Sequence, residues 1–231
     1  MAVEKKPVKQ PVEKTVVKVN SGESTTMKTK DERRGAAKGK RIAAVVFWLL
    51  AIVCEVLAIM VLSGYMYVAN PLLWLCIFIV ADLALVITGS QFWKKANDVD
   101  PVSKQNKVKF FLWNQMGLIV SVIAFFPLVI LLLRDKDLDP KTKKIVSIVA
   151  IAALVLASAF SIDYNPVSQE EYEEAQQEYE GQTIYWTRYG KSYHTTLDCP
   201  SLSRSSTVYE GTIEDAFEAN RNDPCDFCVA Q

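Results

Sequence analysis

Histidine is nearly absent from this chain, and neither sign of charge is in excess. The 231 residues include one histidine, His194, and 26 basic residues balance 26 acidic ones. A single histidine excludes catalytic sites that use two imidazoles, and the sequence shows neither a phosphate-binding glycine loop nor a nucleophile paired with a base. We therefore do not expect an enzyme.

Charge is also scarce in the middle of the chain, which consists largely of four apolar runs. Each run is close to the roughly 20 residues that a helix needs to cross a bilayer core. Buried helices of a soluble protein are the alternative, but the rest of the chain offers too little polar surface to cover four of them. We expect a four-helix transmembrane domain at 41–163 in the lipid bilayer of the plasma membrane, with spans at about 42–62, 71–92, 110–133 and 145–162.

Aromatic residues are missing from the first 41 residues, which carry twelve basic and five acidic side chains. Such a segment buries too little apolar surface to offset the entropy of ordering, so 1–40 is predicted to be a disordered basic tail. No small-residue cleavage site follows the first apolar run. A cleavable signal peptide is therefore not expected.

Basic residues near the ends of the runs predict the orientation. The segment 30–41 is strongly basic and the connection 63–70 has no charge, which by the positive-inside bias places the N-terminus in the cytoplasm. Four spans would return the C-terminus to the cytoplasm. The loop 134–144 disagrees, because it should lie outside and yet holds five basic residues. An external C-terminus with oxidised cysteines stays open as the alternative.

Two loops share the pattern Asp-x-Asp-Pro. Aspartate is a common N-cap, and proline is tolerated at the first helical position because its missing N–H has no helical partner there. The pattern predicts helix starts at Asp100–Pro101 and Asp139–Pro140, in preference to a paired cation site.

Two carboxylates interrupt the apolar runs. Glu55 and Asp82 lie near the middle of successive predicted spans, where no Lys or Arg is available at similar depth. Ionisable groups inside a membrane are rare and mark functional sites by default. We regard the pair as a candidate intramembrane polar site, with helix packing through hydrogen bonds as the favoured interpretation and a proton or cation relay as the alternative.

An acidic segment follows at 164–181 and holds six glutamates. Ser168 is a plausible N-cap for a helix and Gly181 a natural stop. We expect a solvated helical linker, with an interaction helix as the less favoured alternative.

The remaining residues, 182–231, contain the single histidine and three of the five cysteines. Alternating aromatic and β-branched residues around "RYGK" predict a hairpin that ends near His194. The spacing H-x4-C-x25-C-x2-C, formed by His194, Cys199, Cys225 and Cys228, predicts a structural Zn²⁺ site, because a Cys-x2-Cys turn and a second pair from a hairpin complete a tetrahedron. A disulfide is the alternative, but three cysteines leave one over and the predicted compartment is reducing.

The order "YHTTLDC … VYEGTIEDAFEA … PCDFC" resembles the N-terminal zinc domain of Ada-type DNA-repair methyltransferases over residues 184–228. By that resemblance Cys199, Cys225 and Cys228 correspond to zinc ligands and His194 to the methyl-accepting cysteine. Histidine cannot accept a methyl group by the thiolate route, so the resemblance does not imply repair activity here. Several spans followed by an Ada-like module is similar to a recurring arrangement of small bacterial membrane proteins.

The balance of charge near the module limits its partners. Residues 163–231 carry fourteen acidic and four basic side chains, so nucleic acid is not an expected partner. Arg188, Lys191 and Arg204 are candidate ligand contacts beside the metal site.

The sequence as a whole predicts an α-helical membrane protein with a small α+β zinc-binding domain and a binding or scaffold role toward a protein partner. The alternative is a transporter or proton-coupled protein that uses Glu55 and Asp82, with the zinc module as regulator.

Overall fold

The computed structural model describes residues 14–19 and 29–229, and the chain divides into two compact units. The helical unit comprises Thr29–Glu170. Among the described residues, the C-terminal unit comprises 171–229 together with 14–19 from the N-terminal part of the chain. Buried apolar side chains form a core within each unit.

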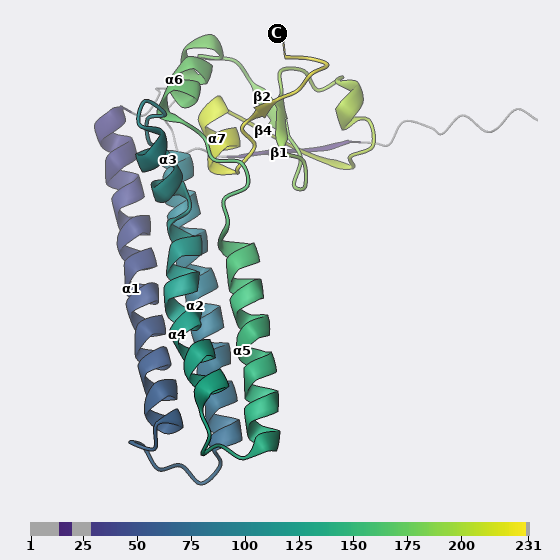
Figure 1. Ribbon diagram of the computed structural model, residues 1–231. Helices are drawn as coiled ribbons and strands as arrows, with labels where there is room; N and C mark the ends of the chain where they lie inside the picture. The colour runs from purple at the N-terminus through teal and green to yellow at the C-terminus, as the bar shows by residue number, and fades with distance from the viewer. Residues whose placement is uncertain (1–13, 20–28, 230–231) are drawn as a thin grey trace, which may run out of the picture. The chain divides into compact units, whose positions relative to one another are not determined.

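Four long helices and one short helix make up the helical unit (Figure 1). The long helices lie side by side, and α2 contacts each of the other three. All four are long and apolar enough to cross a membrane, which confirms the prediction of four such helices. Their bounds are α1 Lys30–Leu62, α2 Pro71–Val99, α4 Met116–Arg134 and α5 Pro140–Ser161, and the short helix is α3 Lys107–Asn114.

Side-chain caps fix the starts of these helices. The Thr29 hydroxyl accepts the backbone N–H of Glu32, and the Glu32 carboxylate accepts the backbone N–H of Thr29 at 2.7 Å, which is a complete capping box for α1. Asp139 accepts the backbone N–H of Thr142 at 3.0 Å, with Pro140 at the first helical position of α5. The predicted helix start at Asp139–Pro140 is therefore confirmed.

The other predicted helix start, at Asp100–Pro101, is wrong. Asp100 ends α2 as its C-cap, and the next helix begins only at Lys107, capped by Asn106. The reason is a competing partner. The guanidinium of Arg41 on α1 donates to the Asp100 carboxylate at 2.9 Å and to its backbone carbonyl at 2.8 Å.

The predicted span 110–133 is two helices in the structure. Asn114 ends α3, and its buried side chain accepts a hydrogen bond from Asn97 at 3.2 Å. The next residue, Gln115, donates through its side-chain amide to the carbonyl of Asp163 at 2.8 Å and accepts the Asp163 backbone N–H at 3.3 Å. Two consecutive amide side chains are thus engaged with other segments where α3 ends and α4 begins.

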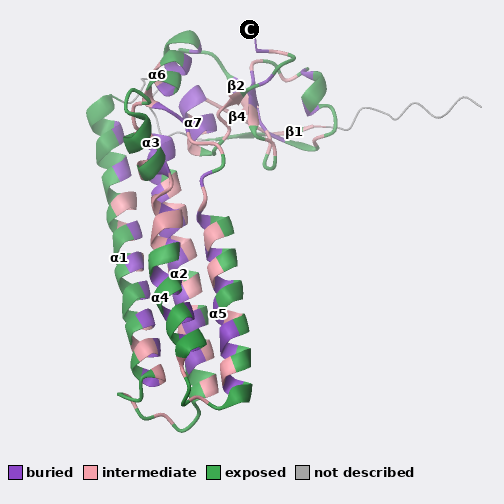
Figure 2. Cartoon of the chain, viewed as in Figure 1, coloured by how far each residue is buried: buried purple, intermediate pink, exposed green. Residues whose placement is uncertain are grey.

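Small residues line the inner face of α1. Ala37, Ala44, Ala51 and Ala58 recur every seven residues, and each is at most 1% exposed. Such residues let helices approach closely without bulky side chains between them. The buried stripes of the long helices face inward and their exposed stripes outward (Figure 2), and many of the outward residues are large aliphatic or aromatic side chains.

The C-terminal unit is a small sheet with two helices. The strand order is β1-β4-β2-β3-β5, in which β2 pairs antiparallel with both β3 and β4, whereas β1 and β5 join in parallel at the edges. The predicted hairpin around "RYGK" is present as β2 and β3. The elements are β1 Thr15–Lys18, α6 Gln169–Glu178, β2 Ile184–Trp186, β3 Ser192–His194, the 3-10 helix η1 Pro200–Leu202, β4 Thr207–Gly211, α7 Ile213–Glu218 and β5 Asp223–Pro224.

Parts of the segment 1–40 that was predicted to be disordered have regular structure. Strand β1 pairs with β4, with Thr15 opposite Thr207, and Lys14 donates to the carbonyl of Leu197 at 2.7 Å. Residues from Lys30 onward are helical. A parallel edge strand such as β1 cannot be predicted from its local sequence, because its partner β4 lies far along the chain. The rest of the predicted tail, 1–13 and 20–28, is outside the described residues.

The acidic segment 164–181 also differs from a simple solvated linker. Tyr172 on α6 is 2% exposed and meets the ring of Phe217 on α7 edge-on at 5.1 Å. Tyr179 packs against Tyr193 of β3 at 5.6 Å. Tyr172 on α6, and Tyr179 just after it, therefore belong to the core of the C-terminal unit although glutamates surround them.

Candidate metal centre

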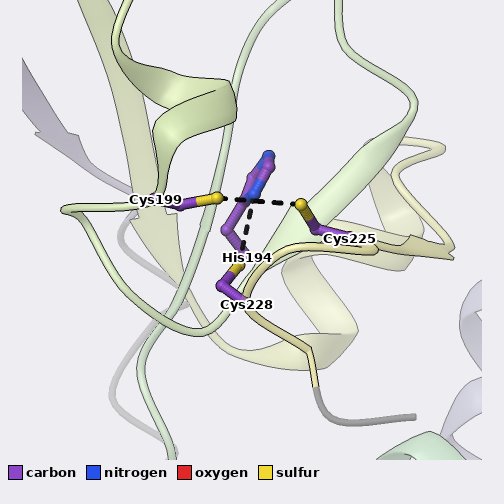
Figure 3. A group of neighbouring side chains, drawn as sticks. All are labelled: His194, Cys199, Cys225 and Cys228. Atoms are coloured by element: carbon purple, nitrogen blue, oxygen red, sulfur yellow. Dashed lines mark hydrogen bonds between the residues drawn. The ribbon is translucent and has the colours of Figure 1, made fainter.

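Four metal-ligating side chains converge at one end of the sheet (Figure 3). His194 is the last residue of β3, and Cys199 precedes the 3-10 helix η1. Cys225 and Cys228 lie on the turn after β5. The structure thus brings together all four residues that the spacing predicts, from three separate segments.

The distances between the ligand atoms are short. The Sγ atoms of Cys199 and Cys225 lie 3.7 Å apart, and Sγ of Cys228 lies 3.5 Å from Nδ1 of His194. All four candidate ligand atoms lie within 4.8 Å of one another. His194, Cys199 and Cys225 are buried, and Cys228 is partly buried. The cluster is therefore compact and largely shielded from solvent.

These separations fit a tetrahedral metal ion. Bonds of about 2.3 Å to sulfur and about 2.0 Å to nitrogen, as in zinc sites, place two sulfurs about 3.8 Å apart and a sulfur about 3.5 Å from a nitrogen. The two observed pairs, at 3.7 Å and 3.5 Å, match these values. The four side chains can hold a metal ion with little movement.

The cysteines form no disulfide. All five are free, and the 3.7 Å between the Cys199 and Cys225 sulfurs is well beyond the roughly 2.05 Å of an S–S bond. Two further cysteines, Cys54 and Cys76, belong to the helical unit and take no part in the cluster.

Backbone hydrogen bonds hold the Cys-x2-Cys turn in place. The backbone N–H of Cys225 donates to the carbonyl of Tyr193 at 3.2 Å, which ties the turn to β3 next to His194. The N–H of Cys228 donates to the Cys225 carbonyl at 3.3 Å, and the hydroxyl of Thr195 donates to the Cys228 carbonyl at 2.5 Å. These hydrogen bonds fix the turn that carries Cys225 and Cys228 next to His194.

The environment tunes the protonation of the ligands. Burial lowers the pKa of His194, so its ring is neutral at pH 7 and has a lone pair for a metal. Burial, together with the neighbouring thiols, raises the pKa of Cys228 to about 11. At Cys225 burial acts in the same direction, but the backbone N–H of Phe227 and the hydroxyl of Ser201 outweigh it and lower the pKa. A metal ion that binds here would therefore have to displace thiol protons.

An arginine that the sequence analysis did not single out stabilises the hairpin beside the centre. Arg221 donates through Nε to the carbonyl of Thr187 at 3.0 Å and through a second nitrogen to the carbonyl of Arg188. Both acceptors lie in the turn between β2 and β3. No short motif contains this pair of residues, and only the folded sheet brings them together.

The three candidate ligand contacts are not gathered in one place. Lys191 lines a small hollow of about 220 Å³ together with His194, Cys225 and Phe227. Arg188 and Arg204 are exposed but do not line this hollow, and the guanidinium of Arg188 lies 5.7 Å from its neighbouring Tyr189 ring. Only Lys191 is therefore positioned next to the four candidate ligands.

The predicted carboxyl pair lies inside the helical unit. Glu55 is 7% exposed and Asp82 is 1% exposed, and the two groups are close enough to interact electrostatically. Both oxygens of Asp82 and one oxygen of Glu55 are buried and have no hydrogen-bond partner in the described part of the chain. The backbone N–H of Leu128, next to Pro127 in α4, approaches the Glu55 carboxyl. The nearby helix α4 offers the hydroxyl of Ser121, but that hydroxyl bonds to Gly117 and Ser161.

No family model matches the chain, and neither a curated protein nor a solved structure matches it.

Proposed function

We propose that this protein is a multi-pass membrane protein whose C-terminal unit binds one structural Zn²⁺ and recruits a protein partner to the plasma membrane. The observation that carries the proposal is the cluster of His194, Cys199, Cys225 and Cys228, whose measured separations fit tetrahedral coordination. Both termini are proposed to be cytoplasmic, because the basic segment 30–41 precedes the first span. A reducing compartment also keeps the thiols available for the metal.

The surface of the helical unit supports the membrane assignment. The outward faces of α1, α2, α4 and α5 are apolar, as a bilayer requires and as water disfavours. Examples from all four helices are more than half exposed. They are Ile42, Leu49, Leu73, Ile123, Leu133 and Val155.

The ligand set supports a structural rather than a catalytic metal. Four protein ligands fill a tetrahedral site and leave no position for water or substrate. The resemblance to Ada-type zinc domains points to the same role for the three cysteines, with His194 in place of the methyl acceptor. Nucleic acid is not proposed as a partner, since the unit is acidic.

Exposed aromatic residues beside the centre support a role in protein binding. Phe227 lies between the two turn cysteines and is 73% exposed, and Tyr189 at the hairpin turn is 89% exposed. Aromatic side chains are enriched at the energetically dominant positions of protein interfaces. We infer that the metal holds Phe227 rigidly at the surface and that the partner binds there.

The test is the metal content of the full-length protein purified in detergent. We expect one zinc per chain, and loss of that zinc in Cys225→Ser and His194→Ala. Cys54→Ser and Cys76→Ser are matched controls, because they remove thiols of the helical unit and should retain the metal. Equal metal content in all variants, or none in the wild type, would contradict the proposal. Resistance to alkaline carbonate extraction tests the membrane assignment separately.

Asp82 favours a second candidate function, a proton- or cation-coupled transporter with the zinc module as regulator. A buried carboxyl group with two unpartnered oxygens is unusual for a residue that serves only to pack helices. The test is proton flux into proteoliposomes that contain a pH-sensitive dye. Asp82→Asn and Glu55→Gln should abolish the flux, whereas the exposed loop control Asp137→Asn should not. If the wild-type protein gives no more flux than protein-free liposomes, transport is contradicted and Glu55 and Asp82 serve helix packing.

A further inference from the structure

A second candidate site lies at the N-terminal end of α1, within the helical unit. Arg34, Lys38 and Arg41 are spaced four and three residues apart, so they share one face of the helix. The same face continues with three exposed aliphatic residues, Ile42, Val45 and Val46. The face therefore changes from basic to aliphatic along the helix axis.

Two connected depressions cover this face. A polar pocket of about 540 Å³ is lined by Arg34, Arg41, Lys109, Trp113, Gln169 and most residues of the loop 100–106, although not by Lys104. An apolar groove of about 480 Å³ runs from the basic residues over the aliphatic ones. Both depressions include Arg34, Arg41 and Asp100, so they are continuous.

The polar pocket has an excess of positive charge. Asp100 is its only acidic residue among the described residues that line it, and this carboxylate is already paired with Arg41 at 2.9 Å. Arg34 and Lys109 are exposed and have no ion-pair partner in the described chain. The backbone N–H of Lys109 is capped by the Asn106 side chain at 3.0 Å, so the positive charge of the pocket comes from its side chains.

Arg41 is held rigidly at the junction of the two depressions. Its guanidinium donates twice to Asp100 and lies 5.4 Å from the ring centroid of Trp113. Its Nε and the Trp113 Nε1 are buried donors that have no acceptor in the described part of the chain. Such donors are costly unless an acceptor is supplied.

We propose that this site binds an anionic phospholipid, with its phosphate in the polar pocket and an acyl chain along the groove. The inference rests on the proposed membrane location. The distance along α1 from Arg34 to Val46 is about 18 Å at 1.5 Å per residue, which is similar to a headgroup together with much of one half of the roughly 30 Å hydrocarbon core. A free phosphate ion would use the pocket but not the apolar groove. The continuity of the two depressions therefore favours the lipid.

The experiment is native mass spectrometry of the full-length protein in detergent, with phosphatidylglycerol or phosphatidylcholine added. We expect one tightly held phosphatidylglycerol per chain and much weaker binding of phosphatidylcholine. Each basic residue near an anionic lipid surface is worth about fivefold in affinity, so Arg34→Gln with Lys109→Gln should weaken phosphatidylglycerol binding by about 30-fold. Lys136→Gln with Lys144→Gln removes the same charge from exposed positions at the other end of the bundle and should have little effect.

Two further measurements separate binding of a lipid from binding of a free phosphate ion and from failure of the membrane assignment. Val45→Asn alters only the groove and should weaken the lipid while leaving any binding of inorganic phosphate unchanged. Equal binding of the two lipids, or equal loss in both double variants, would overturn the lipid site, as would binding of inorganic phosphate alone. If alkaline carbonate extracts the protein from membranes, the proposed membrane location fails instead. These outcomes distinguish the two proposals.

Discussion

Removal of the metal should unfold the C-terminal unit and leave the helical unit intact. The C-terminal unit has about 60 residues after position 170, for which a typical stability is about 3–9 kcal/mol. Structural zinc in small domains contributes about 10–16 kcal/mol of apparent binding free energy at pH 7. The metal term therefore exceeds the whole expected stability of the unit, and the unit without metal should be mostly unfolded. The helical unit has its own buried core and no part in the cluster.

Hydrogen exchange of the detergent-solubilised protein, measured with and without a zinc chelator, tests this prediction. Amides such as Cys225 N–H, which bonds to Tyr193, should lose protection factors of about one hundred to one million, because each 1.4 kcal/mol corresponds to tenfold. Peptides of α1 to α5 should be unchanged, and Cys54→Ser should behave as the wild type. Unchanged exchange in β2 and β3 after the metal has been removed would refute the reasoning.

Three further predictions concern packing, capping and pH. Gly89→Ala should lower the stability of the helical unit by about 1–3 kcal/mol in thermal unfolding, because the added Cβ would lie 2.6 Å from Nε1 of Trp48. Gly35→Ala is the control, since its added Cβ would have nothing within 4 Å and the change should be neutral or stabilising. Equal effects of the two substitutions would contradict the packing argument. Asp139→Ala should cost about 1 kcal/mol through loss of the α5 cap, and an unchanged Tm would argue against the cap. Burial lowers the pKa of His194, so the unfolded chain binds a proton there more readily than the folded chain, and folding stability is lost as the pH falls below about 6.5. Zinc release to a coloured chelator should therefore rise between pH 7.5 and 5.5. Release that does not change with pH would contradict the predicted direction of this pH dependence.

Features that depend on a short window of sequence were predictable. The spacing of His194, Cys199, Cys225 and Cys228 predicted the cluster, because a Cys-x2-Cys turn and a hairpin end each fix two ligands locally. The four apolar helices follow from run length alone. The cap at Asp139 follows from its immediate neighbours.

Features that depend on a distant partner were not predictable. Strand β1 exists through its pairing with β4, and a segment that is rich in Lys and Val shows no local sign of that pairing. Tyr172 is flanked by glutamates on α6, and only its contact with Phe217 makes it a core residue. The break between α3 and α4 depends on Asp163, which binds Gln115 from the far end of α5.

Arg41 connects one failed prediction with the proposed lipid site. Asp100 has the same local sequence signal as Asp139, and it would cap a helix if its carboxylate were available. Arg41 engages that carboxylate from 59 positions away, and the loop 100–106 then stays open as a wall of the polar pocket. Asp100 therefore does not N-cap a helix, and residues after it line the polar pocket instead. Departures from local rules are expected at functional sites, where another requirement outweighs helix stability. The missing helix start at Asp100 therefore supports the proposed lipid site at this end of the helical unit.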